Sequence, residues 1–127
     1  MSISMNQIEV FFSDYARALG ARDIAAIVAC WGVPTLVLSD AAAIAATKIE
    51  EVGAFFSSSM QQYEKVASAH PIIHSVLVLS DNVVSCQVIW EHRDEAGNVV
   101  GGEAGHYMLR RDGTALHIHG YTPMSAK

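Results

Sequence analysis

The stretch of residues 15–28, YARALGARDIAAIV, decides how the first third of the chain folds. Apolar side chains lead into it at three- and four-residue spacing, which predicts an amphipathic helix over residues 5–19 that ends at Gly20. Beyond Gly20, Asp23 can cap a second, shorter helix, and the two together predict a helical hairpin packed on an apolar surface. The apolar faces carry Ile8, Phe11, Phe12, Tyr15, Ala16 and Leu19 on the first helix, and Ile24, Ile27, Val28 and Trp31 on the second.

A third helix is predicted to begin at Thr47, where the sequence Thr-Lys-Ile-Glu matches a capping box, and to end before the pair His70-Pro71. Between the second and third helices, residues 35–39 and 43–46 are predicted to be short strands, the second of them weakened by its alanines. The apolar face of the third helix carries Val52, Phe55, Phe56, Met60, Tyr63 and Ala67.

After Pro71 the sequence becomes rich in Val, Ile and Leu, with short polar connections that predict antiparallel neighbours. The predicted strands are residues 72–80, 83–92, 99–111 and 115–121. The order of elements predicts an α+β fold, in which three helices from the first half pack on a strongly curved, mixed, mostly antiparallel sheet. We expect residues 1–127 to form a single domain.

Composition excludes several classes of protein. Of 127 residues, 51% are hydrophobic and 17% charged, which excludes intrinsic disorder. The net charge of −5 repels phosphate backbones, so we expect no nucleic-acid partner. No apolar run approaches the roughly 18 residues of a membrane span, and no signal peptide is visible. The sequence has only two cysteines, too few for a disulfide scaffold, so we expect a cytoplasmic protein. It has no nucleotide-binding or catalytic-serine motif, and we therefore expect no cofactor.

The order of elements, the stretch Tyr15–Val28 and the helix start at residues 47–52 resemble the nuclear transport factor 2-like superfamily, also called cystatin-like or SnoaL-like. The resemblance covers about residues 8–121. It implies a cone-shaped sheet that leaves a deep apolar pocket at its open end, and a homodimer formed through the outer sheet face. Because this superfamily includes both enzymes and binding proteins, the resemblance implies no single activity.

Among the enzymes of that superfamily, ketosteroid isomerase offers the closest comparison and implies three catalytic positions. Tyr15 matches its oxyanion-binding tyrosine. The base aspartate falls on Ser39 or, with one inserted residue, on Asp40. The second oxyanion donor falls on His106, so this comparison aims His106 inward. Each has a structural alternative: Tyr15 as a hydrogen-bonded core residue, Asp40 as a turn residue and His106 as a histidine bonded across the sheet.

We expect the pocket to be lined by large apolar side chains, with Trp90 able to stack on a planar ligand or to serve simply as core. The predicted ligand-binding residues are Phe12, Trp31, Phe56, Met60, Trp90 and Met108. The sequence thus predicts a protein that binds a small, hydrophobic, oxygenated ligand, acting as a cofactor-free isomerase, lyase or hydrolase. The alternative is a non-catalytic, dimeric ligand-binding or scaffold domain.

His117 and His119 share one face of the last predicted strand. Such a pair occurs in metal sites, but a third ligand would have to come from another strand. If Leu116 and Ile118 face the core, the two histidines point outward. We therefore expect an interface or a solvated pair and no metal. Cys30 and Cys86 are expected to be buried, inert thiols.

Overall fold

A capped helix begins the fold. The computed structural model describes residues 2–124, apart from the side chain of Gln62, and its first element is α1 (Met5–Ala21). Ser4 accepts a hydrogen bond from the Gln7 backbone N–H, and the Gln7 side chain accepts one from the backbone N–H of Ser4, which forms a capping box. The helix ends at Ala21 and is capped by Arg22, which takes the left-handed conformation (φ 53°), so the prediction that it ends at Gly20 is wrong. Arg22 holds this position because its guanidinium donates to the carbonyls of Tyr63 and Glu64.

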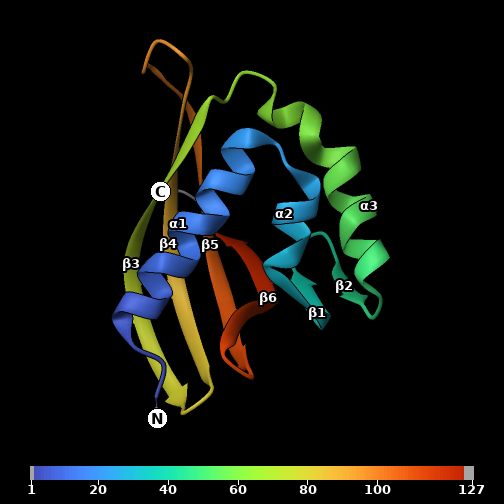
Figure 1. Ribbon diagram of the computed structural model, residues 1–127. Helices are drawn as coiled ribbons and strands as arrows, with labels where there is room; N and C mark the ends of the chain where they lie inside the picture. Colours follow the sequence, from blue (N-terminus) through green and yellow to red (C-terminus); the bar gives the residue numbers. More distant parts are fainter. Residues whose placement is uncertain (1, 125–127) are drawn as a thin grey trace.

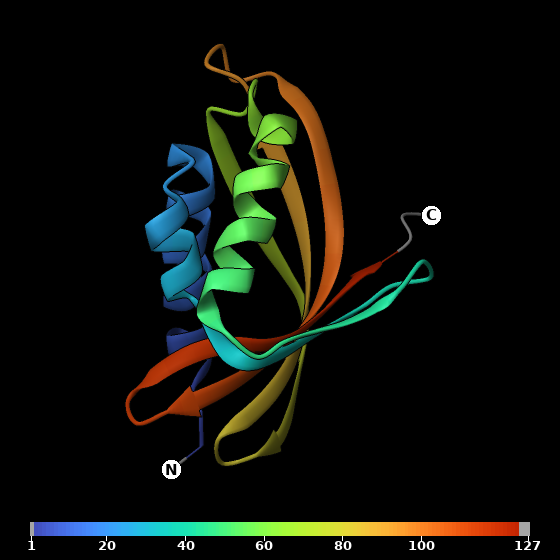
Figure 2. The same cartoon turned by 90° about the vertical axis from the view of Figure 1, so that its right-hand side faces the viewer.

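The predicted order of elements is confirmed. After α1 come α2 (Ile24–Ala29), β1 (Trp31–Leu38), β2 (Ala43–Ala46), α3 (Ile49–Ser59), the short 3-10 helix η1 (Met60–Tyr63), β3 (Ser68–Ser80), β4 (Val83–Arg93), β5 (Val99–Asp112) and β6 (Ala115–Met124). The three helices lie on one side of the sheet, which curves around them (Figures 1 and 2). No helix within residues 2–124 is long and apolar enough to cross a membrane.

The sheet is mixed and mostly antiparallel, as predicted. Its strands lie in the order β2-β1-β6-β5-β4-β3. Among the strands of residues 2–124, only β1 and β6 run parallel, since the chain crosses between them through α3 and the long hairpins. The β1–β2 hairpin and the end of β6 extend away from the helices (Figure 2). This arrangement leaves a hollow between α3, the hairpin and the middle of the sheet.

Several other element boundaries also differ from the prediction. Trp31 begins β1 instead of ending the second helix, because it pairs with Ile118 of β6. The third helix ends at Ser59, eight residues before Ala67. β3 already begins at Ser68, and Pro71 lies within it, which is tolerated because β3 is an edge strand of the sheet.

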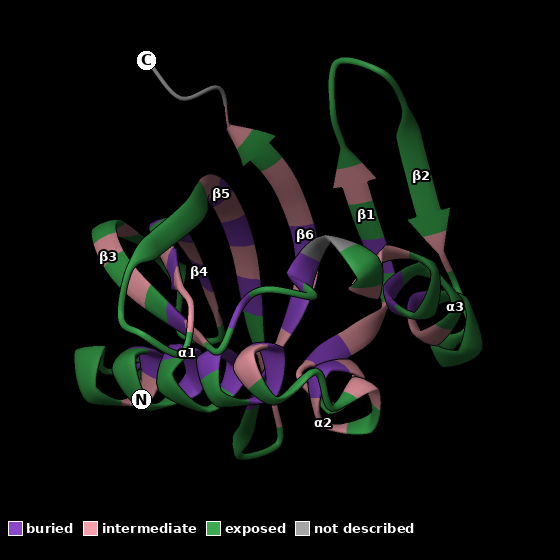
Figure 3. Cartoon of the chain, turned by 90° about the horizontal axis from the view of Figure 1, so that it is seen from above, coloured by how far each residue is buried: buried purple, intermediate pink, exposed green. Residues whose placement is uncertain are grey.

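The core lies between α1 and the inner face of the sheet, where buried residues of β4, β5 and β6 meet the apolar face of the helix (Figure 3). Its centre is aromatic. The rings of Phe12, Tyr15, Trp90 and Tyr107 pack edge to face, with centroids 5.3–6.5 Å apart. Phe12 and Trp90 are almost fully buried, so this cluster forms a rigid base for the hollow next to it.

Candidate functional site

A cavity of about 570 Å³ opens between α1, α3 and the concave side of the sheet. Most of its wall is apolar, and its polar groups come from tyrosine, threonine, serine and glutamate. It is lined by Tyr15, Leu19, Trp31, Thr35, Val37, Ile44, Ala45, Ala46, Glu51, Val52, Ala54, Phe55, Phe56, Ser58, Tyr63, Glu103, Tyr107 and Tyr121. A larger hollow of about 840 Å³ between α1 and β3 is a more open groove without such buried polar groups. The first cavity therefore has the composition of a ligand site.

Two phenols in the cavity wall are each backed by an indole. The Trp31 Nε1–H donates to the Tyr15 hydroxyl oxygen at 3.2 Å, and the Trp90 Nε1–H donates to the Tyr107 hydroxyl oxygen at 3.0 Å. A tyrosine hydroxyl can accept and donate at once. Within residues 2–124 neither hydroxyl hydrogen has an acceptor, so both remain able to donate to a ligand.

Burial keeps both phenols protonated. It raises the pKa of Tyr15 and of Tyr107 well above the ordinary value, and this effect outweighs the hydrogen bonds from Trp31 and Trp90, which lower the pKa. The pKa of Tyr121, a third phenol of the cavity, is raised by burial to about 12. The cavity therefore offers neutral hydrogen-bond donors over the whole physiological pH range.

Glu103 places a carboxylate in the same wall. It accepts a hydrogen bond from the Tyr63 hydroxyl at 3.2 Å, and its Oε1 lies 3.9 Å from His92 Nε2. The other carboxylate of the cavity, Glu51, is occupied at the start of α3, where its Oε1 accepts from the backbone N–H groups of Thr47 and Lys48. Glu103 is thus the carboxylate that is available for proton transfer.

The charges of the cavity restrict its ligand. No lysine, arginine or histidine lines it among the described residues, whereas two glutamates do. An anion would meet like charge in a partly dry site, which is unfavourable. Thr35 adds one more polar atom to this wall, a buried hydroxyl with no hydrogen-bond partner in the described part of the chain. The arrangement suits an uncharged, mostly apolar molecule that carries a hydrogen-bond acceptor.

This combination of a helix-covered, curved sheet and a hollow at its open side can be compared with known families. A family model described as NTF2-like protein (DUF6841) matches residues 6–125. The chain belongs to this NTF2-like family. The resemblance to the nuclear transport factor 2-like superfamily is thereby confirmed. No curated protein matches the chain.

Solved structures show the same fold at low identity. An NTF-2 like protein of unknown function from Shewanella oneidensis MR-1 has a TM-score of 0.77 and 10% identity, over 97% of this chain and 100% of that one. A domain of unknown function with a cystatin-like fold from Nostoc punctiforme PCC 73102 has a TM-score of 0.76 and 9% identity, over 98% of this chain and 80% of that one. A ketosteroid isomerase-like protein from Erwinia carotovora atroseptica SCRI1043 has a TM-score of 0.67 and 21% identity, over 96% of this chain and 97% of that one.

The NTF2-like fold brings some of the predicted site residues together. Tyr15, Trp31 and Phe56 all line the cavity. Phe12 and Trp90 lie behind the lining: the Phe12 ring packs against Tyr107, and Trp90 packs against Tyr15 and donates to the Tyr107 hydroxyl. Met60 begins η1 and packs against the core without lining the cavity.

The prediction that His106 points into the pocket is wrong. On β5 the odd-numbered residues face the helices, since Tyr107 lines the cavity and Leu109 is fully buried. Side chains alternate along a strand, so His106 and Met108 lie on the outer face. Asp40 is exposed in the turn between β1 and β2 and does not line the cavity. Tyr15 therefore shares the cavity with neither of the other two predicted catalytic residues.

Sequence reasoning missed Tyr107 and Glu103. A local signal was present for Tyr107, because Tyr107 and Leu109 are together more apolar than His106 and Met108, whereas the comparison with ketosteroid isomerase selected the face of His106. Glu103 had no such signal, since a charged side chain does not mark an inner face.

The remaining reactive side chains lie outside the cavity. Burial raises the pKa of the thiols of Cys30 and Cys86 to about 11, so both are protonated and poorly nucleophilic. His117 and His119 both lie against the carboxylate of Asp112. No group of three or more potential ligands within residues 2–124 is arranged to hold a metal ion.

Proposed function

We propose that this NTF2-like chain binds an uncharged, hydrophobic small molecule with a ketone-like oxygen, and that it moves a proton beside that oxygen without a cofactor. The observation that carries the proposal is the pair of cavity phenols, Tyr15 and Tyr107. Each accepts an indole N–H from behind, and no acceptor for its own hydrogen is present in the described part of the chain. Donation from the indole polarises the phenol and strengthens the bond that it gives.

The reaction that fits this wall is enolisation. Glu103 takes a proton from the carbon next to the carbonyl, and the electron pair of that C–H bond moves onto the carbonyl oxygen. Tyr15 and Tyr107 donate to the enolate oxygen that forms, which stabilises the developing charge. If the proton on Glu103 is first replaced by one from solvent, its delivery to the same carbon gives hydrogen exchange; delivery of a proton to a different carbon of a conjugated ligand gives isomerisation.

Binding of 2-acetylnaphthalene, an aromatic ketone that the cavity can enclose, tests the proposal. We expect Tyr15→Phe and Tyr107→Phe each to weaken binding by about tenfold, because each removes one hydrogen bond to the ketone. The control ligand is 2-isopropenylnaphthalene, in which a CH₂ group replaces the oxygen; both variants should bind it as well as the wild type does. Equal affinity of all three proteins for the ketone would contradict the proposal.

A non-catalytic, dimeric binding role is the second candidate. It is supported by the apolar side chains of Ile72, Leu77 and Ile89, which are exposed on the outer face of β3 and β4. Exposed apolar patches of this kind often mark interfaces. Binding of the ketone without any hydrogen exchange would favour this second role.

A further inference from the structure

The hydrogen-bonded ladders on both sides of β6 break at the same residue, His119. On the β5 side, Leu109 pairs with Ile118 and Met108 with Gly120, so His119 is an extra residue. On the β1 side, Trp31 pairs with Ile118 and Leu36 with Gly120, so residues 32–35 stand opposite His119 alone. Bulges of this kind redirect side chains and are common beside binding sites.

This double bulge shapes the wall of the cavity. Ile118 is fully buried in the core, and strict alternation would turn Tyr121 to the opposite face of the sheet. The extra residue reverses the alternation, so Tyr121 lines the cavity. On β1, Trp31 directly precedes the bulged segment and Thr35 is its last residue, and both also line the cavity.

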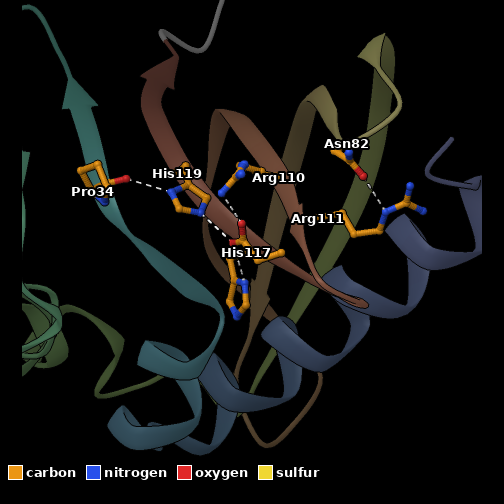
Figure 4. A network of polar contacts seen from close by, with 7 residues as sticks. Pro34, Asn82, Arg110, Arg111, His117 and His119 are labelled. Atoms are coloured by element: carbon orange, nitrogen blue, oxygen red, sulfur yellow. Dashed lines mark hydrogen bonds and ion pairs between the residues drawn. The ribbon is translucent and has the colours of Figure 1, made fainter. Parts of the chain in front are cut away.

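The imidazole of His119 holds the bulged segment to the neighbouring hairpin (Figure 4). Its Nδ1 lies 2.8 Å from the carbonyl oxygen of Pro34 in β1, and its Nε2 lies 2.9 Å from Oδ2 of Asp112 at the end of β5. The β1 backbone passes close to the ring, since a Cβ atom on Gly32 would lie only 2.4 Å from Nε2. No side chain larger than hydrogen fits at Gly32 without displacing the ring.

Both partners of His119 are oxygen atoms that accept and do not donate, so the two bonds form together only when both ring nitrogens carry hydrogen. The charged and titratable groups around this ring are Asp112, His117, whose Nδ1 lies 3.0 Å from the same Oδ2, and Arg110, which forms an ion pair with Asp112. The hydrogen bond from His119 is the largest of the influences that lower the pKa of Asp112.

We propose that His119, held by Asp112, is a positioning residue of the cavity: it fixes the β1 bulge and thereby the placement of Trp31, Thr35 and Tyr121. Trp31 in turn donates to Tyr15, so His119 acts on the ligand-binding phenol from the outer side of the sheet. The effect on ligand affinity rests on the proposed function, whereas the effect on Trp31 does not.

The test compares His119→Gln with His117→Gln by NMR and by ketone binding. His117 is the matched control, because it lies on the same strand and bonds to the same carboxylate but makes no hydrogen bond to β1. In His119→Gln the indole N–H resonance of Trp31 should shift while that of Trp90 stays, and affinity for 2-acetylnaphthalene should fall about tenfold.

His117→Gln should leave the Trp31 resonance in place and the affinity within about twofold of the wild type. Asp112→Ala removes the anchor without changing His119, and should shift the Trp31 resonance even if His119→Gln fails to fold. The proposal is overturned if Trp31 is undisturbed in His119→Gln or Asp112→Ala, or if His117→Gln disturbs it equally. A shifted Trp31 resonance in a chain that binds no ketone would support the positioning role and contradict only the proposed function.

Discussion

Glu103→Gln should lower the rate at which the chain exchanges the methyl hydrogens of 2-acetylnaphthalene for deuterium by about 10²- to 10⁴-fold, because it removes the general base. The amide keeps the size of the side chain and can still accept the hydrogen bond from Tyr63. The cavity should therefore keep its shape, and affinity for the ketone should change little. Proton NMR in D₂O measures the exchange as loss of the methyl signal.

The matched control for this variant is Glu91→Gln. Glu91 lies on the neighbouring strand β4, and its side chain is 34% exposed compared with 37% for Glu103, but it pairs with Arg93 outside the cavity. Its substitution should leave the exchange rate at the wild-type value. If Glu103→Gln exchanges as fast as Glu91→Gln, Glu103 is not the base.

The second large fall in the hydrogen-exchange rate is expected when either of the two phenol hydroxyls is removed. Tyr15→Phe and Tyr107→Phe should each lower the exchange rate by about 10²- to 10³-fold, the usual loss when one oxyanion donor is removed. This is more than the loss in binding, because the enolate carries more charge on its oxygen than the ketone does. Since burial raises the pKa of both phenols, the effect should persist well above neutral pH.

Tyr121→Phe provides the graded comparison. Tyr121 lines the same cavity, but no indole donates to its hydroxyl among the described residues, and it is less buried than Tyr15 and Tyr107. We expect a loss of at most about tenfold in the exchange rate. Equal losses for Tyr15, Tyr107 and Tyr121 would contradict the special role of the indole-backed pair.

The fold was largely predictable from local patterns. The apolar spacing of α1 and the aspartate cap of α2 act over a few residues and do not depend on distant contacts. Boundaries that depend on tertiary partners were predicted less well. Arg22 ends α1 because of carbonyls 41 and 42 residues away, and the start of β3 at Ser68 depends on pairing with Arg93.

The site was predictable only in part, since its geometry depends on strand register. Tyr15 and Trp31 were found because both belong to apolar patterns near the N-terminus. On β5 the comparison with a distant enzyme selected the wrong face, and a shift of one residue exchanges His106 for Tyr107. On β6 the bulge at His119 turns Tyr121 inward, and no alternation pattern in the sequence reveals it.

The most direct test of the account is the infrared spectrum of bound 2-acetylnaphthalene labelled with ¹³C at the carbonyl. If Tyr15 and Tyr107 both donate to the ligand oxygen, the carbonyl band of the complex lies well below its position in a hydrocarbon solvent, and each Tyr→Phe variant moves it part of the way back. A band at the hydrocarbon position that neither substitution moves would show that the two phenols do not hold the ligand oxygen, and the proposed chemistry would be wrong.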